Sequence, residues 1–371
     1  MSVRLQVAIA GGGTGGHVTP ALAIGDACVA AGLPAPLFIG TSHGLEARLV
    51  PQRGYRLLVV PGERLVNTGL LGKLRGAWAL WRGVLAARTL LRDHGVGLVI
   101  GVGGYASGAA LLAARTLGLP TAIHESNAVP GLTNRILGRV VQRCYLGFEA
   151  ALASFPPARS VLVGNPVRKE IASLPAERGL PLVGSRPLRV LVVGGSQGAQ
   201  FLNAEVPGLL QAVAARLRAA GWGLQVVHQV GKLDGGPVQA RYQELGIDAQ
   251  VVGYIDDMAD RLGAADFAIT RAGSGTIAEL AAASLPALLV PFPFAAGDHQ
   301  AANAAAFCRG GAGLWARQAA FEVEKLAPQI ATLLTDPAAY AAATRAARAS
   351  QRPDAAAALV ADCIRRSEEG R

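Results

Sequence analysis

One histidine stands directly behind a run of glycines near the amino terminus. The segment VAIAGGGTGGHVTP (7–20) places His17 after five glycines within residues 11–16. Imidazole titrates near neutral pH, so it can accept a proton from an attacking hydroxyl. Glycines permit tight turns with exposed backbone N–H groups, which attract anions. The segment therefore predicts an anion-binding turn beside a candidate general base. The alternatives are a purely structural turn, or a His17 that orients the loop or binds a diphosphate as a cation.

Two residues at the end of another apolar run, His124 and Glu125, are rival candidates for the base. Three other histidines have no comparable neighbours, and we expect them to be surface or packing residues: His43, His94 and His228.

Three further glycine-rich segments each join an expected strand to an expected helix: 101–108, 192–200 and 270–280. In the second, Ser196 and Gln197 can donate hydrogen bonds at the helix start. In the third, Glu279 can accept hydrogen bonds from ribose hydroxyls, or it is only a favourable charge near a helix N-terminus. Four such turns together favour a phosphorylated ligand over a purely structural explanation.

Several common functional classes lack their signature residues. The chain has no G-x-x-x-x-G-K-[ST] segment, and no acidic residue ends the second expected strand to hold a ribose, which weakens a dehydrogenase interpretation. The four cysteines are scattered without a Cys-x-x-Cys, so we expect neither a disulfide framework nor a thiolate metal site, and this usage fits a reducing cytosol.

The positive charge is concentrated in the first half of the chain. The net charge is +10, and residues 1–160 carry 15 Lys/Arg against 6 Asp/Glu, whereas residues 161–371 carry 20 against 19. This bias suggests an anionic partner there, either nucleic acid or a membrane surface. Two uncharged stretches, 95–114 and 280–297, are interrupted by glycines or prolines. We expect neither a membrane-spanning helix nor a signal peptide.

Apolar runs alternate with helical patterns along the whole chain. Expected strands of the first half are 6–10, 37–39, 57–60, 98–101, 121–123 and 144–146, and those of the second are 188–193, 224–227, 250–252, 267–269 and 287–290. Residues 188–206 repeat the plan of the opening segment. We therefore expect an α/β protein with two Rossmann-like domains, residues 1–163 and 164–350, whose parallel sheets face a central cleft. Residues 351–371 are expected to form a helix that packs back on the first domain.

An ordered set of motifs closely resembles the MurG family over essentially the whole chain. The motifs are GGGTGGHVTPALAIG, GGYASGAA, HESNAVPGLTNRILGR, GNPVR, GGSQGA, TRAGSGTIAELAAASLPALLVPFP and DHQAANA. The resemblance implies the GT-B architecture and an inverting N-acetylglucosaminyltransferase of peptidoglycan synthesis, with roles in cell shape and division. Its donor would be UDP-N-acetylglucosamine. Its acceptor would be the 4-hydroxyl of N-acetylmuramyl-pentapeptide pyrophosphoryl-undecaprenol, at the cytoplasmic face of the plasma membrane. No nucleic acid is expected as a partner.

The same resemblance implies roles for individual residues. His17 matches the proposed general base, and Asn127 matches an asparagine near the transferred sugar. Residues implied to contact UDP-N-acetylglucosamine are Thr14, Gly15, Gly16, Arg168, Ser196, Ile255 (through its backbone, at the uracil), Ser274, Gly275, Thr276, Glu279 and Gln300. Ser126 stands where family members are expected to have glutamine, which puts a ligand contact from that position in doubt.

No metal and no cofactor is expected. Many nucleotide-sugar transferases hold a metal with Asp-x-Asp, but this chain has no such motif, and IDDMAD (255–260) has the wrong spacing. Helix N-termini and backbone amides of the second-half glycine loops would take up the developing diphosphate charge.

The segment 62–95 mixes apolar and basic residues in a helical pattern. A basic helix with Trp and Leu suits an interfacial, non-spanning segment, although an ordinary crossover helix is the alternative. The membrane-associating candidates are Leu70, Lys73, Leu74, Arg75, Trp78, Trp81 and Arg82. Two other functions stay open: a related GT-B enzyme that glycosylates diacylglycerol, and a non-catalytic nucleotide-sugar or nucleic-acid binding module.

Overall fold

The computed structural model describes the chain apart from residues 1–4, 14, 62–69, 351, 353 and 370–371, and it divides into two compact units. Unit 1 comprises Met1–Arg168 and Pro353–Arg371, and unit 2 comprises Lys169–Arg352. The boundaries expected from the sequence, after residues 163 and 350, fall a few residues before the observed ones.

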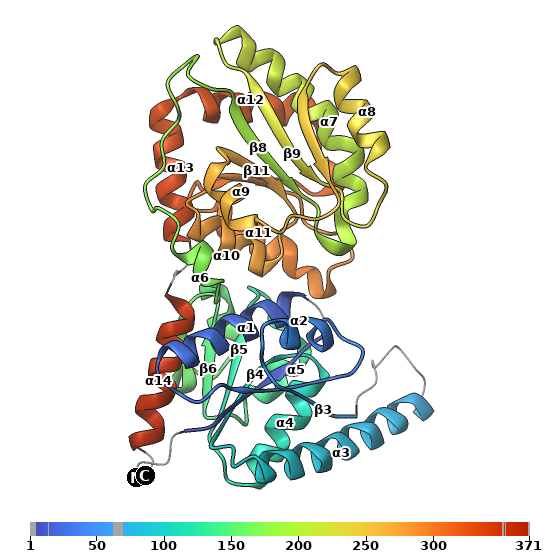
Figure 1. The fold of residues 1–371 in the computed structure, drawn as a ribbon, viewed down its shortest axis with the longest axis vertical. Helices are drawn as coiled ribbons and strands as arrows, with labels where there is room; N and C mark the ends of the chain where they lie inside the picture. Colours follow the sequence, from blue (N-terminus) through green and yellow to red (C-terminus); the bar gives the residue numbers. More distant parts are fainter. Residues whose placement is uncertain (1–4, 14, 62–69, 351, 353, 370–371) are drawn as a thin grey trace. The chain divides into compact units, whose positions relative to one another are not determined.

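Within the described residues of unit 1, seven parallel strands form one sheet in the order β3-β2-β1-β4-β5-β6-β7 (Figure 1). The strands are β1 (Val7–Gly11), β2 (Leu37–Gly40), β3 (Leu57–Val59), β4 (Leu98–Gly103), β5 (Thr121–Glu125), β6 (Arg143–Leu146) and β7 (Ser160–Leu162). The α-helices are α1 (Gly15–Ala30), α2 (Glu46–Gln52), α3 (Leu70–Asp93), α4 (Tyr105–Thr116), α5 (Leu132–Leu137) and α14 (Ala355–Glu369). Short 3₁₀ helices cover Glu149–Ser154 and Pro157–Arg159.

Both faces of the unit 1 sheet are buried, which is why its strands read as continuous apolar runs. In β1, Val7 and Ile9 pack with α1 and α14, whereas Ala8 and Ala10 pack on the opposite face among residues of α3 and α4. The C-terminal helix α14 is attached to this unit by polar contacts as well. Asp362 accepts hydrogen bonds from Arg143 Nε and from the Tyr145 hydroxyl, both at 2.9 Å.

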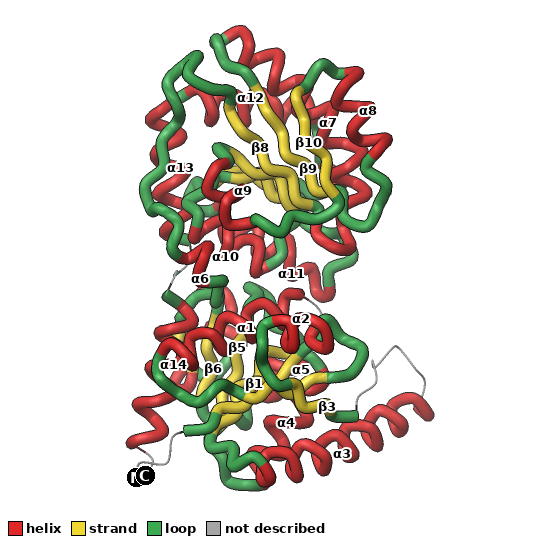
Figure 2. The backbone as a smooth tube through the Cα atoms, in the orientation of Figure 1, coloured by secondary structure: helices red, strands yellow, loops and turns green. Residues whose placement is uncertain are grey.

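Unit 2 repeats the plan with a second parallel sheet, in the order β10-β9-β8-β11-β12-β13 (Figure 2). Its strands are β8 (Leu188–Val193), β9 (Leu224–Gln229), β10 (Asp248–Val252), β11 (Phe267–Thr270), β12 (Ala287–Leu289) and β13 (Gly313–Trp315). Its α-helices are α6 (Lys169–Ala172), α7 (Gly195–Ala219), α8 (Gly236–Glu244), α9 (Met258–Ala264), α10 (Ser274–Ala282), α11 (His299–Cys308), α12 (Val323–Thr335) and α13 (Pro337–Ala349), with 3₁₀ turns at Ala296–Asp298 and Gln318–Ala320. The three-residue β13 was not expected from the sequence.

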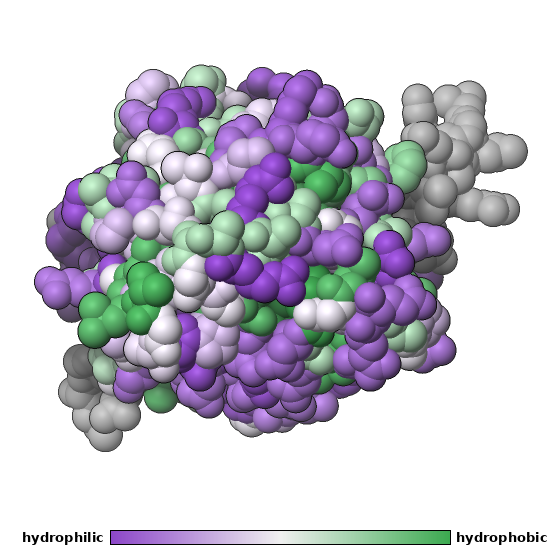
Figure 3. Space-filling view, turned by 90° about the horizontal axis from the view of Figure 1, so that it is seen from above, coloured by the Kyte–Doolittle hydropathy of each residue, from purple (hydrophilic) through white to green (hydrophobic). Residues whose placement is uncertain are grey.

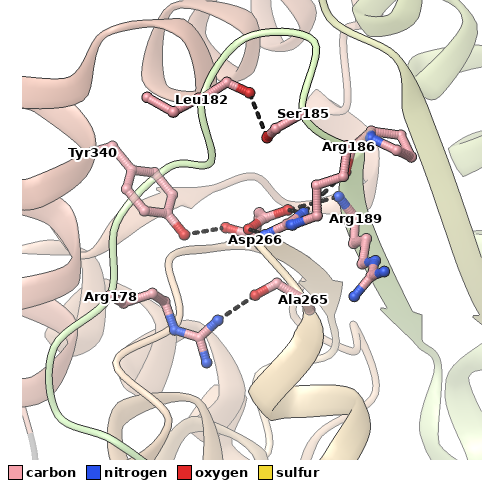
Figure 4. A network of polar contacts seen from close by, with 9 residues as sticks. Arg178, Leu182, Ser185, Arg186, Arg189, Ala265, Asp266 and Tyr340 are labelled. Atoms are coloured by element: carbon pink, nitrogen blue, oxygen red, sulfur yellow. Dashed lines mark hydrogen bonds and ion pairs between the residues drawn. The ribbon is translucent and has the colours of Figure 1, made fainter.

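A polar network ties the segment before β8 to β11 and α13 (Figure 4). The Asp266 carboxylate is buried and accepts two hydrogen bonds from the Arg186 guanidinium, at 2.7 and 2.8 Å, and one from the Arg189 N–H at 2.8 Å. The Tyr340 hydroxyl donates to the Asp266 carbonyl at 2.9 Å, and Arg178 donates to the Ala265 carbonyl. These contacts lie around the amino ends of the strands.

In the described part of the chain, no helix combines the length and the apolar character needed to cross a bilayer. On the face of unit 2 seen in Figure 3, hydrophilic and hydrophobic residues are interspersed.

Candidate functional site

The strand order of unit 1 reverses between β1 and β4, and both strands end in glycine turns at the same edge of the sheet. Ligands of open parallel sheets bind outside the carboxyl ends of the strands at such a reversal. The two turns are in backbone contact, because a Cβ built on Gly104 would lie 2.8 Å from the Gly12 carbonyl oxygen. Gly103 and Gly104 also have φ angles of +104° and +83°, which side-chain-bearing residues rarely adopt.

His17, in the first turn of α1, lies at this junction. Its Nδ1 is 3.1 Å from the Gly12 carbonyl oxygen. Because a carbonyl can only accept, Nδ1 carries the proton of this hydrogen bond, and Nε2 of the neutral ring is then an acceptor. Nε2 lies beside Gly103, where a built Cβ would be 2.8 Å away. Gly15 and Gly16 occupy the same first turn, and Thr14 lies outside the described residues.

Glu125, at the end of β5, is buried, and its carboxylate accepts four hydrogen bonds. Oε1 accepts from Asn127 N at 2.9 Å and from Asn127 Nδ2 at 3.2 Å. Oε2 accepts from Gly131 N at 3.1 Å and from Asn134 Nδ2 at 3.0 Å. With all of these donors arranged around it, Glu125 shapes the loop that carries Asn127. The sequence did not predict the contact of Asn134 with Glu125, because an asparagine in a helical segment does not indicate which residue it will contact.

His124 and Ser126 point into the protein. His124 is fully buried, with Nε2 3.1 Å from the Gly164 carbonyl oxygen and Nδ1 3.3 Å from Ser126 Oγ. Burial lowers the pKa of His124 to about 4, so the ring is neutral at physiological pH. Both ring nitrogens have protein partners, which leaves neither for an acceptor hydroxyl. Ser126, at the position where glutamine was expected, is likewise buried, and its carbonyl accepts from Asn165 Nδ2 at 2.9 Å.

In unit 2 the strand order reverses between β8 and β11. A glycine turn and a helix follow each of these strands, α7 after β8 and α10 after β11. The N-caps of α7 and α10 are Gly194 and Gly273, which have no side chain to occupy the free N–H groups of the first turn. Ser274 is buried at the start of α10, and the half-buried residues that follow it are Gly275, Thr276 and Glu279. The side chains of Ser196 and Gln197, in the first turn of α7, lie outside the described residues.

Gln300 of α11 holds the loop that leads into α10. Its Oε1 accepts from Ala272 N at 3.2 Å and from Phe292 N at 2.9 Å, so its amide N–H₂ is the part that can donate elsewhere. Asn303 Nδ2 donates to the Ala272 carbonyl at 3.2 Å. Sequence reasoning found Gln300 only through the family resemblance and missed Asn303.

Arg271 is a second residue of this loop that the sequence did not single out. It is buried, it donates to the Val290 carbonyl at 3.1 Å, and its guanidinium lies 5.8 and 5.7 Å from the ring centroids of Phe201 and Phe292. Burial lowers the pKa of Arg271 to about 10, so it is still cationic at neutral pH. The sequence feature that could have indicated Arg271 is its position as a basic residue directly after an apolar strand.

Two residues that are expected to contact the sugar donor lie outside the glycine-rich loops. Ile255 is buried in the segment after β10, next to the exposed Tyr254. Arg168 is half-buried and is the last residue of the main segment of unit 1. Apart from Arg168, the candidate residues that the structure describes follow the carboxyl ends of strands, one set in each unit.

The helix α3 carries an exposed aromatic pair. Trp78 and Trp81 are 60% and 52% exposed, and their rings stack at 4.9 Å between centroids. Leu85 is exposed one turn further along, and Arg82 is exposed beside them. Figure 1 shows α3 lying alongside α4. The side chains of the other expected membrane residues, Leu70, Lys73, Leu74 and Arg75, lie outside the described residues.

Two parallel sheets with glycine-rich loops at their carboxyl edges are compatible with several classes of nucleotide-sugar enzyme, and comparisons with known proteins identify the class as a glycosyltransferase. The glycosyltransferase family 28 N-terminal domain matches residues 7–146, and the glycosyltransferase family 28 C-terminal domain matches residues 189–359. The expected GT-B class is confirmed.

Similarity to individual proteins is more specific. The chain is 45% identical over 359 residues to the UDP-N-acetylglucosamine–N-acetylmuramyl-(pentapeptide) pyrophosphoryl-undecaprenol N-acetylglucosamine transferase of Acidithiobacillus ferrooxidans, covering 97% of each chain. It is 40% identical to the protein of the same name from a Geobacter species, covering 98% of this chain and 97% of the relative. The crystal structure of Acinetobacter baumannii MurG matches with a TM-score of 0.78 and 31% identity over 98% of this chain and 99% of that one. The chain belongs to the MurG family.

Proposed function

We propose that this protein transfers N-acetylglucosamine from UDP-N-acetylglucosamine to the 4-hydroxyl of N-acetylmuramyl-pentapeptide pyrophosphoryl-undecaprenol, with inversion at the anomeric carbon. The supporting observation is the 45% identity over 97% of the chain to a relative whose name states this donor group and acceptor. The geometry of the two edge sites is compatible with it, because one presents a base and the other presents uncapped helix N-termini.

His17 is the general base in this proposal. Its Nε2 takes the proton of the acceptor hydroxyl as the hydroxyl oxygen forms a bond to the anomeric carbon, and the bond from that carbon to UDP breaks with its electron pair on UDP. The hydrogen bond from Nδ1–H to the Gly12 carbonyl supports this role, because it leaves the Nε2 lone pair available. Glu125 then acts by holding Asn127 near the transferred sugar rather than as a second base, since four donors already stabilise its carboxylate.

The departing UDP is stabilised by unit 2. The first turns of α7 and α10 offer to the diphosphate N–H groups that have no partner within their own helix, together with the positive ends of their helix dipoles. Ser196, Gln197, Ser274, Gly275 and Thr276 belong to these turns, and Glu279 accepts from the ribose hydroxyls. In the same proposal Gln300 donates its N–H₂ to sugar hydroxyls, Ile255 contacts the uracil through its backbone, and Thr14, Gly15, Gly16 and Arg168 contact the donor.

Unit 1 docks on an anionic membrane surface through α3. Stacked, exposed tryptophans beside arginine suit the interfacial region of a bilayer, where aromatic rings and cationic side chains are both stabilised. Replacing Trp78 and Trp81 together by alanine should lower co-sedimentation with phosphatidylglycerol vesicles, whereas Trp315→Ala, at an exposed tryptophan of unit 2, should not. Equal binding by all three proteins would contradict the membrane role.

The transfer itself is tested by measuring UDP release from UDP-N-acetylglucosamine with a soluble analogue of the muramyl acceptor. Diacylglycerol in vesicles serves as the alternative acceptor. We expect UDP release with the muramyl analogue and none with diacylglycerol. Release with diacylglycerol alone would assign the chain to glycolipid synthesis, and release with neither would favour a binding protein.

A further inference from the structure

The carboxylate of Glu46 is buried next to the glycine turn that precedes His17. Glu46 is the first residue of α2, it is 2% exposed, and its Oε2 accepts from Gly13 N at 2.7 Å. Its Oε1 accepts from Thr41 N at 3.0 Å and from Thr41 Oγ1 at 2.8 Å. The carboxylate therefore connects the turn after β1 to the turn after β2.

Three glycines leave the space that this carboxylate occupies. A Cβ on Gly12 would overlap the Glu46 carboxyl group, a Cβ on Gly44 would overlap the same group, and a Cβ on Gly40 would lie 2.6 Å from Glu46 Cγ. Gly12 belongs to the turn after β1, whereas Gly40 and Gly44 belong to the segment that leads from β2 to Glu46, and in each case the nearest atom is one of Glu46. Part of the glycine run is thus explained by this protein contact rather than by a ligand.

The contact continues to His17 through the backbone. Gly13, whose N–H donates to Glu46, is bonded directly to Gly12, whose carbonyl receives Nδ1–H of His17. Movement of the turn would move that carbonyl, and with it the group that selects the tautomer and the direction of the ring. Burial alone would raise the pKa of Glu46, but the hydrogen bonds from Gly13 and Thr41 outweigh it and lower the pKa, so the group is an anion at neutral pH.

We propose that Glu46 is a positioning residue for the transfer reaction: its carboxylate holds the Gly11–Gly13 turn so that the Gly12 carbonyl keeps His17 in the Nδ1–H tautomer with Nε2 facing the acceptor. The inference rests on the proposed function of His17. It assigns Glu46 no contact with either substrate, because its carboxylate oxygens are directed at Gly13 and Thr41.

The test compares Glu46→Gln with Tyr145→Phe. Glutamine has nearly the same shape but presents an N–H₂ group to backbone donors. Tyr145→Phe removes a part-buried hydrogen bond of unit 1 that is directed at Asp362 of α14, and it serves as the control for loss of stability. We expect Glu46→Gln to lower kcat by roughly 10- to 100-fold, since small displacements of a catalytic group have effects of this order. KM for UDP-N-acetylglucosamine should change by less than about threefold, and Tyr145→Phe should keep kcat within the same limit.

A second measurement reports on His17 without turnover. Nitrogen-15 spectra of the six histidines, with the His17 signal assigned from a His17→Gln variant, give the tautomer directly. We expect a single Nδ1–H tautomer in the native protein and a mixture in Glu46→Gln. If Glu46→Gln does not fold, Glu46→Asp provides the same comparison, because the shorter side chain cannot reach Gly13 and Thr41 together.

The outcomes separate this inference from the proposed function. An active native enzyme whose Glu46 variants keep the native kcat and His17 tautomer would overturn the inference alone. An altered tautomer in the variants, with no UDP release by the native protein, would support the positioning contact and overturn the proposed reaction. Equal losses of kcat in Glu46→Gln and Tyr145→Phe would show that Glu46 acts only on stability.

Discussion

The Gly103→Ala variant gives the most direct test of where the base lies. Gly103 has a φ angle of +104°, and a Cβ at this position would lie 2.8 Å from His17 Nε2, closer than real Cβ contacts allow. The methyl group therefore has to displace the imidazole or the β4–α4 turn. A displacement of this size at a reacting group can cost on the order of 10²-fold in rate. The unusual backbone angle costs roughly a further 1–2 kcal/mol of stability.

Gly118→Ala separates these two effects. Gly118 has a φ angle of +70° at the end of α4, but a Cβ there meets no atom within 4 Å. Both variants should lose stability in thermal unfolding through the unusual backbone angle, and Gly103→Ala should lose more because of its overlap with His17. Only Gly103→Ala should lose about 10²-fold in kcat for UDP release with the muramyl analogue. If the two variants had the same kcat, the assignment of His17 Nε2 as the proton acceptor would be refuted.

Three other outcomes are expected. Arg186→Ala should lower the free energy of unfolding of unit 2 by about 1.5–3 kcal/mol in urea titration, because the buried Asp266 carboxylate loses two hydrogen bonds from a charged, half-buried guanidinium. Arg241→Ala removes an exposed ion pair and should cost roughly 0.5 kcal/mol; similar losses from the two variants would contradict the importance of burial. His124 and His228 are fully buried and their pKa values are lowered from 6.5 to about 4, so between these pH values the unfolded chain binds protons that the folded protein does not. Stability should therefore fall as the pH is lowered from 6.5 to 4, by about 3 kcal/mol for each group, and an unfolding midpoint that stays constant over this range would be inconsistent with buried neutral rings. UDP release should persist in excess EDTA, since helix N-termini take up the diphosphate charge in the proposed reaction; loss of release that magnesium restores would disprove that account.

Local sequence patterns were sufficient for much of the fold. Strands buried on both faces have to be apolar throughout, so VAIA (7–10) and LVIG (98–101) could be located without any knowledge of their neighbours. The glycine turns that follow them, and the repeated plan at residues 188–206, predicted two parallel sheets with candidate residues at the carboxyl edges. The three-residue strand β13 was not predicted, because its pairing with β12 is a contact between distant residues and leaves no periodic pattern in the sequence.

The roles of individual polar residues were decided by contacts between segments far apart in the chain. His17 and His124 both lie near the carboxyl edge of the unit 1 sheet, one at the start of α1 and the other near the end of β5, and only His124 is fully buried, among residues that include Gly164 and Ser126. Glu125 has the residue type of a base, yet three donors from the next loop and one from α5 surround its carboxylate. Glu46 gave no signal at all, since its partner Gly13 lies 33 residues away.

The sequence by itself determined the sheets, the turns at their edges and, through the motifs, the family. The tertiary structure alone decided which side chains at those edges are buried and which nitrogen of His17 carries a proton. The physical reason is that strand and turn formation depends on neighbouring residues, whereas desolvation and hydrogen bonding depend on whatever atoms the folded chain brings together.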